Sequence, residues 1–188
     1  MNSALSVAGV FVLCVHVVAC GNQQQGLADP SRSANVAGRD SNGSHVQSAT
    51  GHVEFIGRQG AENRYSFSAI KRVQPATGET EIQGELQYQS FRPDGGVVDA
   101  HGDVICVDIV NNVARVGVAA KHVTGVPEGT PAFGYFTVVD NGEGNDAGDL
   151  ASNLFAAPEA TVLQHCASGH VPPPPLFEDL VGNIQVRP

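Results

Sequence analysis

Apolar and polar residues alternate with a period of two along much of the chain. In residues 64–70 (RYSFSAI) the aromatic rings and the alanine share one face, while the arginine and the serines share the other, and residues 82–89 (IQGELQYQ) repeat the pattern. Such alternation is typical of an antiparallel strand with one face on a core and the other in water. Residues 75–78 (PATG) and 92–96 (RPDGG) carry the proline and glycine that tight turns favour, so we expect a turn at each.

The middle of the chain is more apolar. Residues 104–110 (VICVDIV) are mostly β-branched, and Asn111 and Asn112 separate them from a second β-rich run at 113–123. Asparagine tolerates a positive φ, so this pair predicts a hairpin between the two runs.

Two further β-rich runs lie at 132–139 and 182–187, and for residues 149–157 we favour a strand through 153–155 over a helical turn. The pattern predicts an all-β domain over 51–188. We expect an antiparallel β-sandwich or barrel of about eight to ten short strands, with almost no helix.

The N-terminal segment has the features of a targeting signal. Residues 1–19 contain no charged side chain, and their apolar run of about 12 residues is too short to span a bilayer, which takes about 20. We therefore predict a signal peptide at 1–19. The Gly-, Ser-, Asn- and Gln-rich residues 20–50 show no apolar period, which predicts a flexible, disordered linker.

The residues before the second cysteine, Val17-Val18-Ala19-Cys20, resemble the lipobox of bacterial lipoproteins. The resemblance implies cleavage before Cys20, a lipid on its thiol, and attachment of the protein to a membrane of the cell envelope. The alternative is an ordinary secretory signal cleaved near Ala19, which would leave the protein secreted and free of the membrane.

The charge of the chain excludes one class of partner. Ten basic residues against nineteen acidic ones give a formal net charge of −9. Nucleic acids and anionic lipid surfaces are bound through clustered basic residues, so we expect no nucleic-acid partner. With 15% charged and 41% hydrophobic residues, a coiled coil and a fully disordered chain are also disfavoured.

The remaining cysteines predict a disulfide. Cys14 lies in the predicted signal peptide and Cys20 in the predicted lipobox, which leaves Cys106 and Cys166 in the β-domain. Exported compartments oxidise such pairs, and closing a loop of this length stabilises a fold by about 4 kcal/mol in the chain-entropy model.

A metal site is the alternative for one of these cysteines. Cys166 lies close in sequence to His165 and His170, and zinc accepts both types of ligand. The spacing matches none of the usual zinc motifs, so we favour the disulfide.

Residues 140–149 (DNGEGNDAGD) combine carboxylates and amides with three glycines. Calcium prefers six to eight oxygen ligands on a chain that folds tightly around it. A solvated turn explains the same composition, because Asp, Asn and Gly are favoured in turns for backbone reasons. The candidate calcium ligands are Asp140, Asn141, Glu143, Asp146 and Asp149.

Catalytic motifs are absent from the sequence: we find no nucleophile elbow, no phosphate-binding loop and no dinucleotide fingerprint. The histidines His52, His101 and His122, together with Asp103, are the groups from which a hydrolase site would have to be assembled. We name no catalytic residue.

Several segments together resemble a β-domain that recurs in secreted bacterial proteins, related to the post-COAP-like type. The resemblance covers about 51–187 and implies an extracellular all-β domain without implying an activity. The matching pieces are 51–55 (GHVEF), 101–106 (HGDVIC), 139–143 (VDNGE), Cys166 and 182–186 (GNIQV).

These observations favour a non-enzymatic envelope lipoprotein. Its β-domain would have a structural, adhesive or binding role, with a protein or glycan as its partner and no cofactor other than the candidate calcium ion. A secreted hydrolase with a His/carboxylate site and a calcium-dependent adhesion module are the two alternatives.

Overall fold

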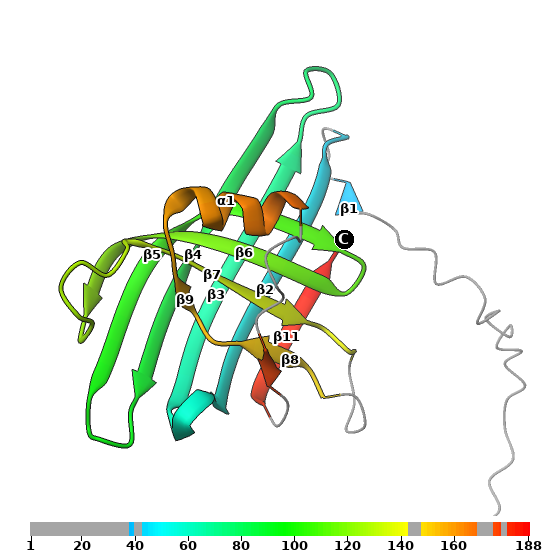
Figure 1. Ribbon diagram of the computed structural model, residues 1–188. Helices are drawn as coiled ribbons and strands as arrows, with labels where there is room; N and C mark the ends of the chain where they lie inside the picture. The colour runs from blue at the N-terminus through cyan, green and yellow to red at the C-terminus, as the bar shows by residue number, and fades with distance from the viewer. Residues whose placement is uncertain (1–37, 40–42, 143–147, 169–174, 178–179) are drawn as a thin grey trace, which may run out of the picture. The chain divides into compact units, whose positions relative to one another are not determined.

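One antiparallel sheet runs through most of the folded chain (Figure 1). The computed structural model describes residues 38–39, 43–142, 148–168, 175–177 and 180–188, all of which belong to the unit Ala34–Pro188. Among these residues there is no helix with the length and apolar character needed to cross a membrane.

The sheet follows chain order for most of its width, as β1-β2-β3-β4-β5-β6-β7-β8-β10, while β9 pairs with β7 and the C-terminal strand β11 returns to pair with β2. The strands β2 to β6 have 12 to 14 residues each and are longer than expected. The elements are β1 (Gly38–Arg39), β2 (His45–Ile56), η1 (Arg58–Gly60), β3 (Glu62–Val73), β4 (Thr80–Phe91), β5 (Val97–Val110), β6 (Val113–Thr124), β7 (Phe133–Val139), β8 (Leu150–Ser152), β9 (Phe155–Ala156), α1 (Glu159–Ser168), β10 (Leu176–Phe177) and β11 (Val181–Arg187).

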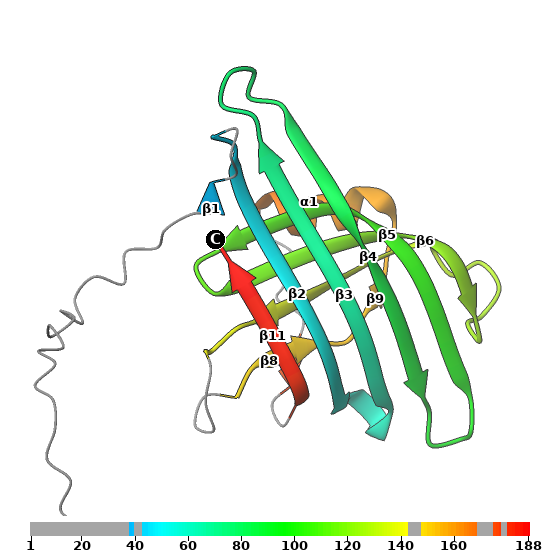
Figure 2. The same ribbon diagram turned by 180° about the vertical axis from the view of Figure 1, so that it is seen from behind.

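The sheet folds over on itself along β5. This strand pairs with β4 only through residues 97–103, whereas it stays paired with β6 to its end. Register shifts at His101/Gly102 and at Val104/Cys106 interrupt the β5–β6 ladder, and such bulges increase local twist. The result is a curled half-barrel with two layers: β11, β2, β3, β4 and the start of β5 in one, and the end of β5 with β6, β7 and β8 in the other (Figures 1 and 2).

The core lies between the two layers. Its centre is a group of aromatic rings in which Tyr65, Phe67 and Phe136 lie 5.2 to 6.0 Å from one another. Aliphatic residues from β2, β5 and β6 surround these rings. The alternation in residues 64–70 places Tyr65 and Phe67 inside, and the alternation in residues 82–89 orients β4 in the same way. The predicted all-β antiparallel fold is confirmed.

The predicted turns are confirmed as well. Gly78 N–H donates to Gln74 O in the first turn, and Gly95 N–H donates to Arg92 O in the second. Asn111 has a φ of 55° in the hairpin between β5 and β6.

The folded region begins before Gly51, because β2 starts at His45 and its first residues pair with the end of β3.

Helix α1 was not indicated by the alternation pattern. It packs on the outer face of β5, β6 and β7, where Val162, His165 and Cys166 are buried. The predicted disulfide is confirmed: Cys166 is bonded to Cys106 of β5, with their Cα atoms 6.1 Å apart. Its sulfur is therefore not available as a thiolate, which removes the alternative zinc site.

Gly117 allows this close approach of the helix to the sheet. A Cβ at this position would lie 2.5 Å from both Cys106 Sγ and Val162 Cγ1. Any side chain here would push α1 or the disulfide away from β6, so the absence of a side chain at Gly117 is a requirement of the packing.

Candidate ligand-binding groove

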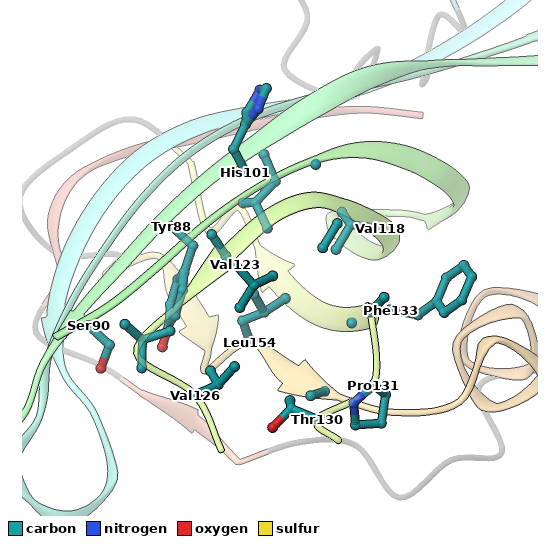
Figure 3. A pocket seen from close by; sticks show the side chains of 18 of the residues that line it. Tyr88, Ser90, His101, Val118, Val123, Val126, Thr130, Pro131, Phe133 and Leu154 are labelled. Carbon is teal, nitrogen blue, oxygen red and sulfur yellow. The ribbon is translucent and has the colours of Figure 1, made fainter. Parts of the chain in front are cut away.

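An apolar cavity opens where the start of β5 and the end of β6 face the segment that leads into β7. Its volume is about 240 Å³, just below the range of about 300–1,000 Å³ that is typical of small-molecule sites. Val118, Val123, Val126 and Leu154 line it, while the imidazole of His101 points away from these side chains (Figure 3). We call this cavity the apolar pocket.

The apolar pocket exists because many residues that line it are small. Larger side chains at these positions would extend the core and fill the space, since protein interiors normally pack with few voids. The small residues come from β5, β6, β7, β9 and the segment before β7, and they are Ala100, Gly102, Ala120, Ala132, Gly134 and Ala156.

A second, polar depression adjoins the apolar pocket. The two share the lining residues Tyr88, Ser90, Arg92 and Leu154. Its other lining residues come from η1 and the start of β3, from the β4–β5 turn, and from β9 and the residues before it. They are Arg58, Gln59, Ala61, Asn63, Pro93, Asp94, Asn153 and Phe155. We call the apolar pocket and this depression together the groove.

A buried hydrogen-bond network forms the floor of the groove. The Tyr88 hydroxyl donates to Asn63 Oδ1 at 2.7 Å, and Asn63 Nδ2 donates to Ala61 O and to Asn153 Oδ1. Burial raises the pKa of Tyr88, and the nearby Arg92 partly opposes this shift. The phenol therefore stays neutral and remains a donor, which fixes the floor in one arrangement.

Two cations line the polar depression. Arg92 Nη2 donates to Gly125 O at 3.3 Å, which ties the β4–β5 turn to the chain after β6. Arg58 lies in η1 and also lines the depression. One carboxylate, Asp94, also lines it, and its Oδ1 accepts the N–H of Gly96 in the same turn.

The acidic segment predicted as a calcium loop has a different role in the described part of the chain. Asp149 Oδ2 accepts the N–H of Ile184, and Asp140 Oδ2 accepts the N–H of Val186, both at 2.8 Å. Ile184 and Val186 belong to β11, so the two carboxylates bridge the space between β11 and the β7–β8 connection. We call this bridged space the seam.

Both oxygens of Asp140 and both oxygens of Asp149 accept a backbone N–H. Asp140 Oδ1 accepts the N–H of Gly142, and Asp149 Oδ1 accepts the N–H of Asn141. Glu143 and Asp146 lie outside the described residues. Within the described ranges no three His, Cys, Asp or Glu side chains group closely enough to hold a metal ion, and the calcium site stays a prediction.

The histidines considered for a hydrolase lie on the outer face of the sheet, on β2, β5 and β6. His52 and His101 line one shallow, open depression, but β3 and β4 separate their strands. His101 Nε2 lies 3.7 Å from Glu85, Asp103 pairs with Lys121 at 2.6 Å, and His122 is exposed opposite His101. The structure therefore places His101 and His122 at paired positions, but β3 and β4 lie between them and His52.

His165 is the most deeply buried titratable side chain under α1. It is 1% exposed, and its ring lies 4.5 Å from that of Tyr135 in a tilted arrangement. Its Nε2 lies 3.2 Å both from the carbonyl oxygen of Phe136 and from Thr137 Oγ1. The carbonyl oxygen of Phe136 can only accept, so this contact favours the tautomer with the proton on Nε2. Among the described residues, Nδ1 has no hydrogen-bond partner. Burial lowers the pKa of His165, so the imidazole is neutral at pH 7.

The groove was not predicted from the sequence, because its lining comes from segments spread over about one hundred residues. The runs of small residues in β5, β6 and β9 were the available signal. The predicted lipidation residue, Cys20, lies outside the described residues.

Comparison of the chain with family models, with curated proteins and with solved structures finds no match in any of the three.

Proposed function

We propose that this protein is a non-enzymatic binding protein that takes up a small, largely apolar molecule in the groove. The observation that carries the proposal is the apolar pocket itself. Elsewhere between the layers the aromatic and aliphatic side chains pack against each other, whereas here small residues leave a space that opens to solvent. Mostly apolar, preformed cavities with a few polar groups at one end are the usual form of small-molecule sites.

The proposed place of action is the cell envelope. The apolar run of residues 1–19 and the sequence Val17-Val18-Ala19-Cys20 support export and attachment through a lipid on Cys20. The groove would then face the space outside the membrane that holds the anchor. Cys20→Ser is expected to shift the protein from the membrane fraction to the soluble fraction of the envelope, and unchanged fractionation would contradict the anchor.

A fluorescence assay tests the binding function. The chain without its predicted signal peptide, carrying Cys20→Ser, is titrated with a neutral dye that fluoresces in apolar surroundings, such as N-phenyl-1-naphthylamine. We expect saturable fluorescence that 1-decanol reverses by competition.

Two matched variants locate the dye. Ala120→Phe places a ring in the apolar pocket and is expected to weaken dye binding by at least about tenfold, or 1.4 kcal/mol. Ala119→Phe adds the same ring one residue earlier, on the outer face of β6, and is expected to leave binding unchanged. No binding to the parent chain, or equal binding to Ala120→Phe, would refute the proposal.

A further inference from the structure

We propose that the ligand of the groove is a single-chain amphipathic carboxylate, whose apolar tail enters the apolar pocket and whose acid group lies against Arg92 and Arg58. This inference rests on the proposed function and names its ligand class. It starts from the asymmetry of the groove: one end is lined by valine, alanine and leucine, the other by arginine and amide side chains.

The two ends are joined in a way that suits one extended molecule. Leu154 and the ring of Tyr88 line both ends, so a chain that leaves the apolar pocket passes directly to the polar depression. Arg92 also lines both, which places a guanidinium at the junction. A molecule with a tail and a single polar head matches this order of surfaces.

The arginines of the groove differ from several other arginines of the fold, although Arg187 of β11, which donates to Gln185 Oε1, also has no described carboxylate within 4 Å. Arg64, Arg72 and Arg115 each have a carboxylate oxygen within 4 Å. For Arg58 and Arg92, no described carboxylate lies within that distance. In a chain with nineteen acidic and ten basic residues, two cations without an acidic partner beside one opening favour an anion as the missing partner.

The charges that line the polar depression leave a positive balance. Arg58 and Arg92 contribute two positive charges and Asp94 one negative charge, and Asp94 already accepts the Gly96 N–H. A guanidinium offers parallel N–H donors that match the two oxygens of a carboxylate. The tail supplies affinity separately, at about fourfold for each methylene group that becomes buried.

The test compares ligands that share a tail and differ in the head group. Decanoate, 1-decanol, decylammonium and decyl phosphate are titrated at low ionic strength into the Cys20→Ser chain without its predicted signal peptide, by calorimetry below their aggregation concentrations. We expect decanoate to bind about tenfold more tightly than decanol, and decylammonium to bind most weakly.

Variants of the arginines assign the head group. Arg92→Gln and the double variant Arg58→Gln/Arg92→Gln are expected to reduce decanoate affinity to that of decanol and to leave decanol affinity unchanged. Arg92→Lys keeps a charge and is expected to retain part of the preference. Arg72→Gln, which removes a cation from the outer face of β3 away from the groove, is the control and should change nothing.

The outcomes separate this inference from the proposed function. Equal binding of decanoate and decanol, or a decanoate preference that survives the double variant, would overturn the carboxylate assignment while the binding function stands. Decyl phosphate binding tenfold more tightly than decanoate would overturn the choice of head group. Failure of every ligand to bind would overturn the proposed function itself.

Discussion

The two open flanks of the half-barrel are treated in opposite ways. At the seam, the free edge of β11 is bridged by the carboxylates of Asp140 and Asp149, and each oxygen has a backbone N–H partner. At the groove, the facing residues are small and the arginines have no described carboxylate partner. The carboxylate oxygens of Asp140 and Asp149 at the first flank therefore have hydrogen-bond partners, whereas the second flank keeps an open space and arginines without a described carboxylate partner.

This difference indicates which flank serves the fold and which serves a ligand. A buried donor or acceptor without a partner costs about 1–3 kcal/mol. A flank whose polar groups are hydrogen-bonded to each other therefore contributes to stability, and few of its donors and acceptors are available to a ligand. A flank with room and unpaired charge contributes less to the fold but can recognise a molecule. Changes at the seam, and at α1 on the layer that carries it, are therefore expected to act on stability, and they follow in order of decreasing expected effect.

The largest effect is expected from the disulfide, which holds α1 against the layer that carries the seam. Replacing Cys106 and Cys166 by alanine opens a loop of 60 residues and should lower the free energy of unfolding by about 4 kcal/mol in the chain-entropy model. Denaturant unfolding measures the loss. A change below about 1 kcal/mol would show that the helix is held mainly by Val162 and its neighbours.

Removing a seam carboxylate should have the next largest effect. Asp149→Ala leaves the N–H groups of Ile184 and Asn141 without their acceptor and is expected to lower stability by about 1.5–3 kcal/mol. Hydrogen exchange should accelerate at the Ile184 amide in particular. Asp99→Ala, which removes an exposed carboxylate bonded to Gln89, is the control and should cost less than about 0.5 kcal/mol.

Acid should weaken the region under α1 through His165. Its pKa is lowered in the folded state by burial, so the unfolded chain, with an ordinary value near 6.5, takes up the proton first as the pH falls. Stability contributed by the neutral ring is fully present above about pH 6.5 and is lost below it, with a slope of up to about 1.4 kcal/mol per pH unit.

The control for this prediction is His165→Gln, which keeps a donor toward Phe136 O but does not titrate. Other charges near the ring are Arg115, which lowers its pKa further, and Asp108, which raises it. Thermal melts between pH 7 and pH 5 should show a smaller slope in the variant. Parallel curves for the two proteins would assign the pH dependence to other groups.

The smallest effect is expected from calcium. The four oxygens of Asp140 and Asp149 already accept backbone N–H groups, so adding calcium or EDTA should leave the melting temperature unchanged. A ligand at a hundredfold excess over its Kd stabilises a fold by about 2.7 kcal/mol. A stabilisation of this size by calcium would show instead that Glu143 and Asp146 complete a metal site, and it would favour the calcium-dependent adhesion module.

Local patterns predicted the strands, the turns and the disulfide, because each depends on neighbouring residues or on elimination. The two-residue period placed Tyr65 and Phe67 inside, and Asn111 marked a hairpin by its tolerance of positive φ. Helix α1 was missed because valine, histidine and cysteine are weak helix formers. Its surest signals, Pro158 at its start and Glu159 in its first turn, are short and local.

The roles of the seam and of the groove could not be predicted from the sequence in the same way. Asp149 and Asp140 accept from residues 35 and 46 positions away, and nothing local distinguishes such carboxylates from those of a solvated turn. The alanines and glycines of the groove acquire their meaning only when β5, β6 and β9 come together. Both features depend on long-range pairing, which a single sequence does not show.

The pairing of β2 with β11 sets the order in which this fold can be completed. Ser48 lies opposite Arg187 in that ladder, so residues 48–54 of β2 have no strand partner on that side until β11 has been synthesised. Contacts of such sequence separation are slow to form, because the intervening loop must close first. An emerging chain would therefore present an unpaired strand edge until β11 becomes available, and such edges promote aggregation. A chain built in this way benefits from being kept unfolded until β11 can pair with β2.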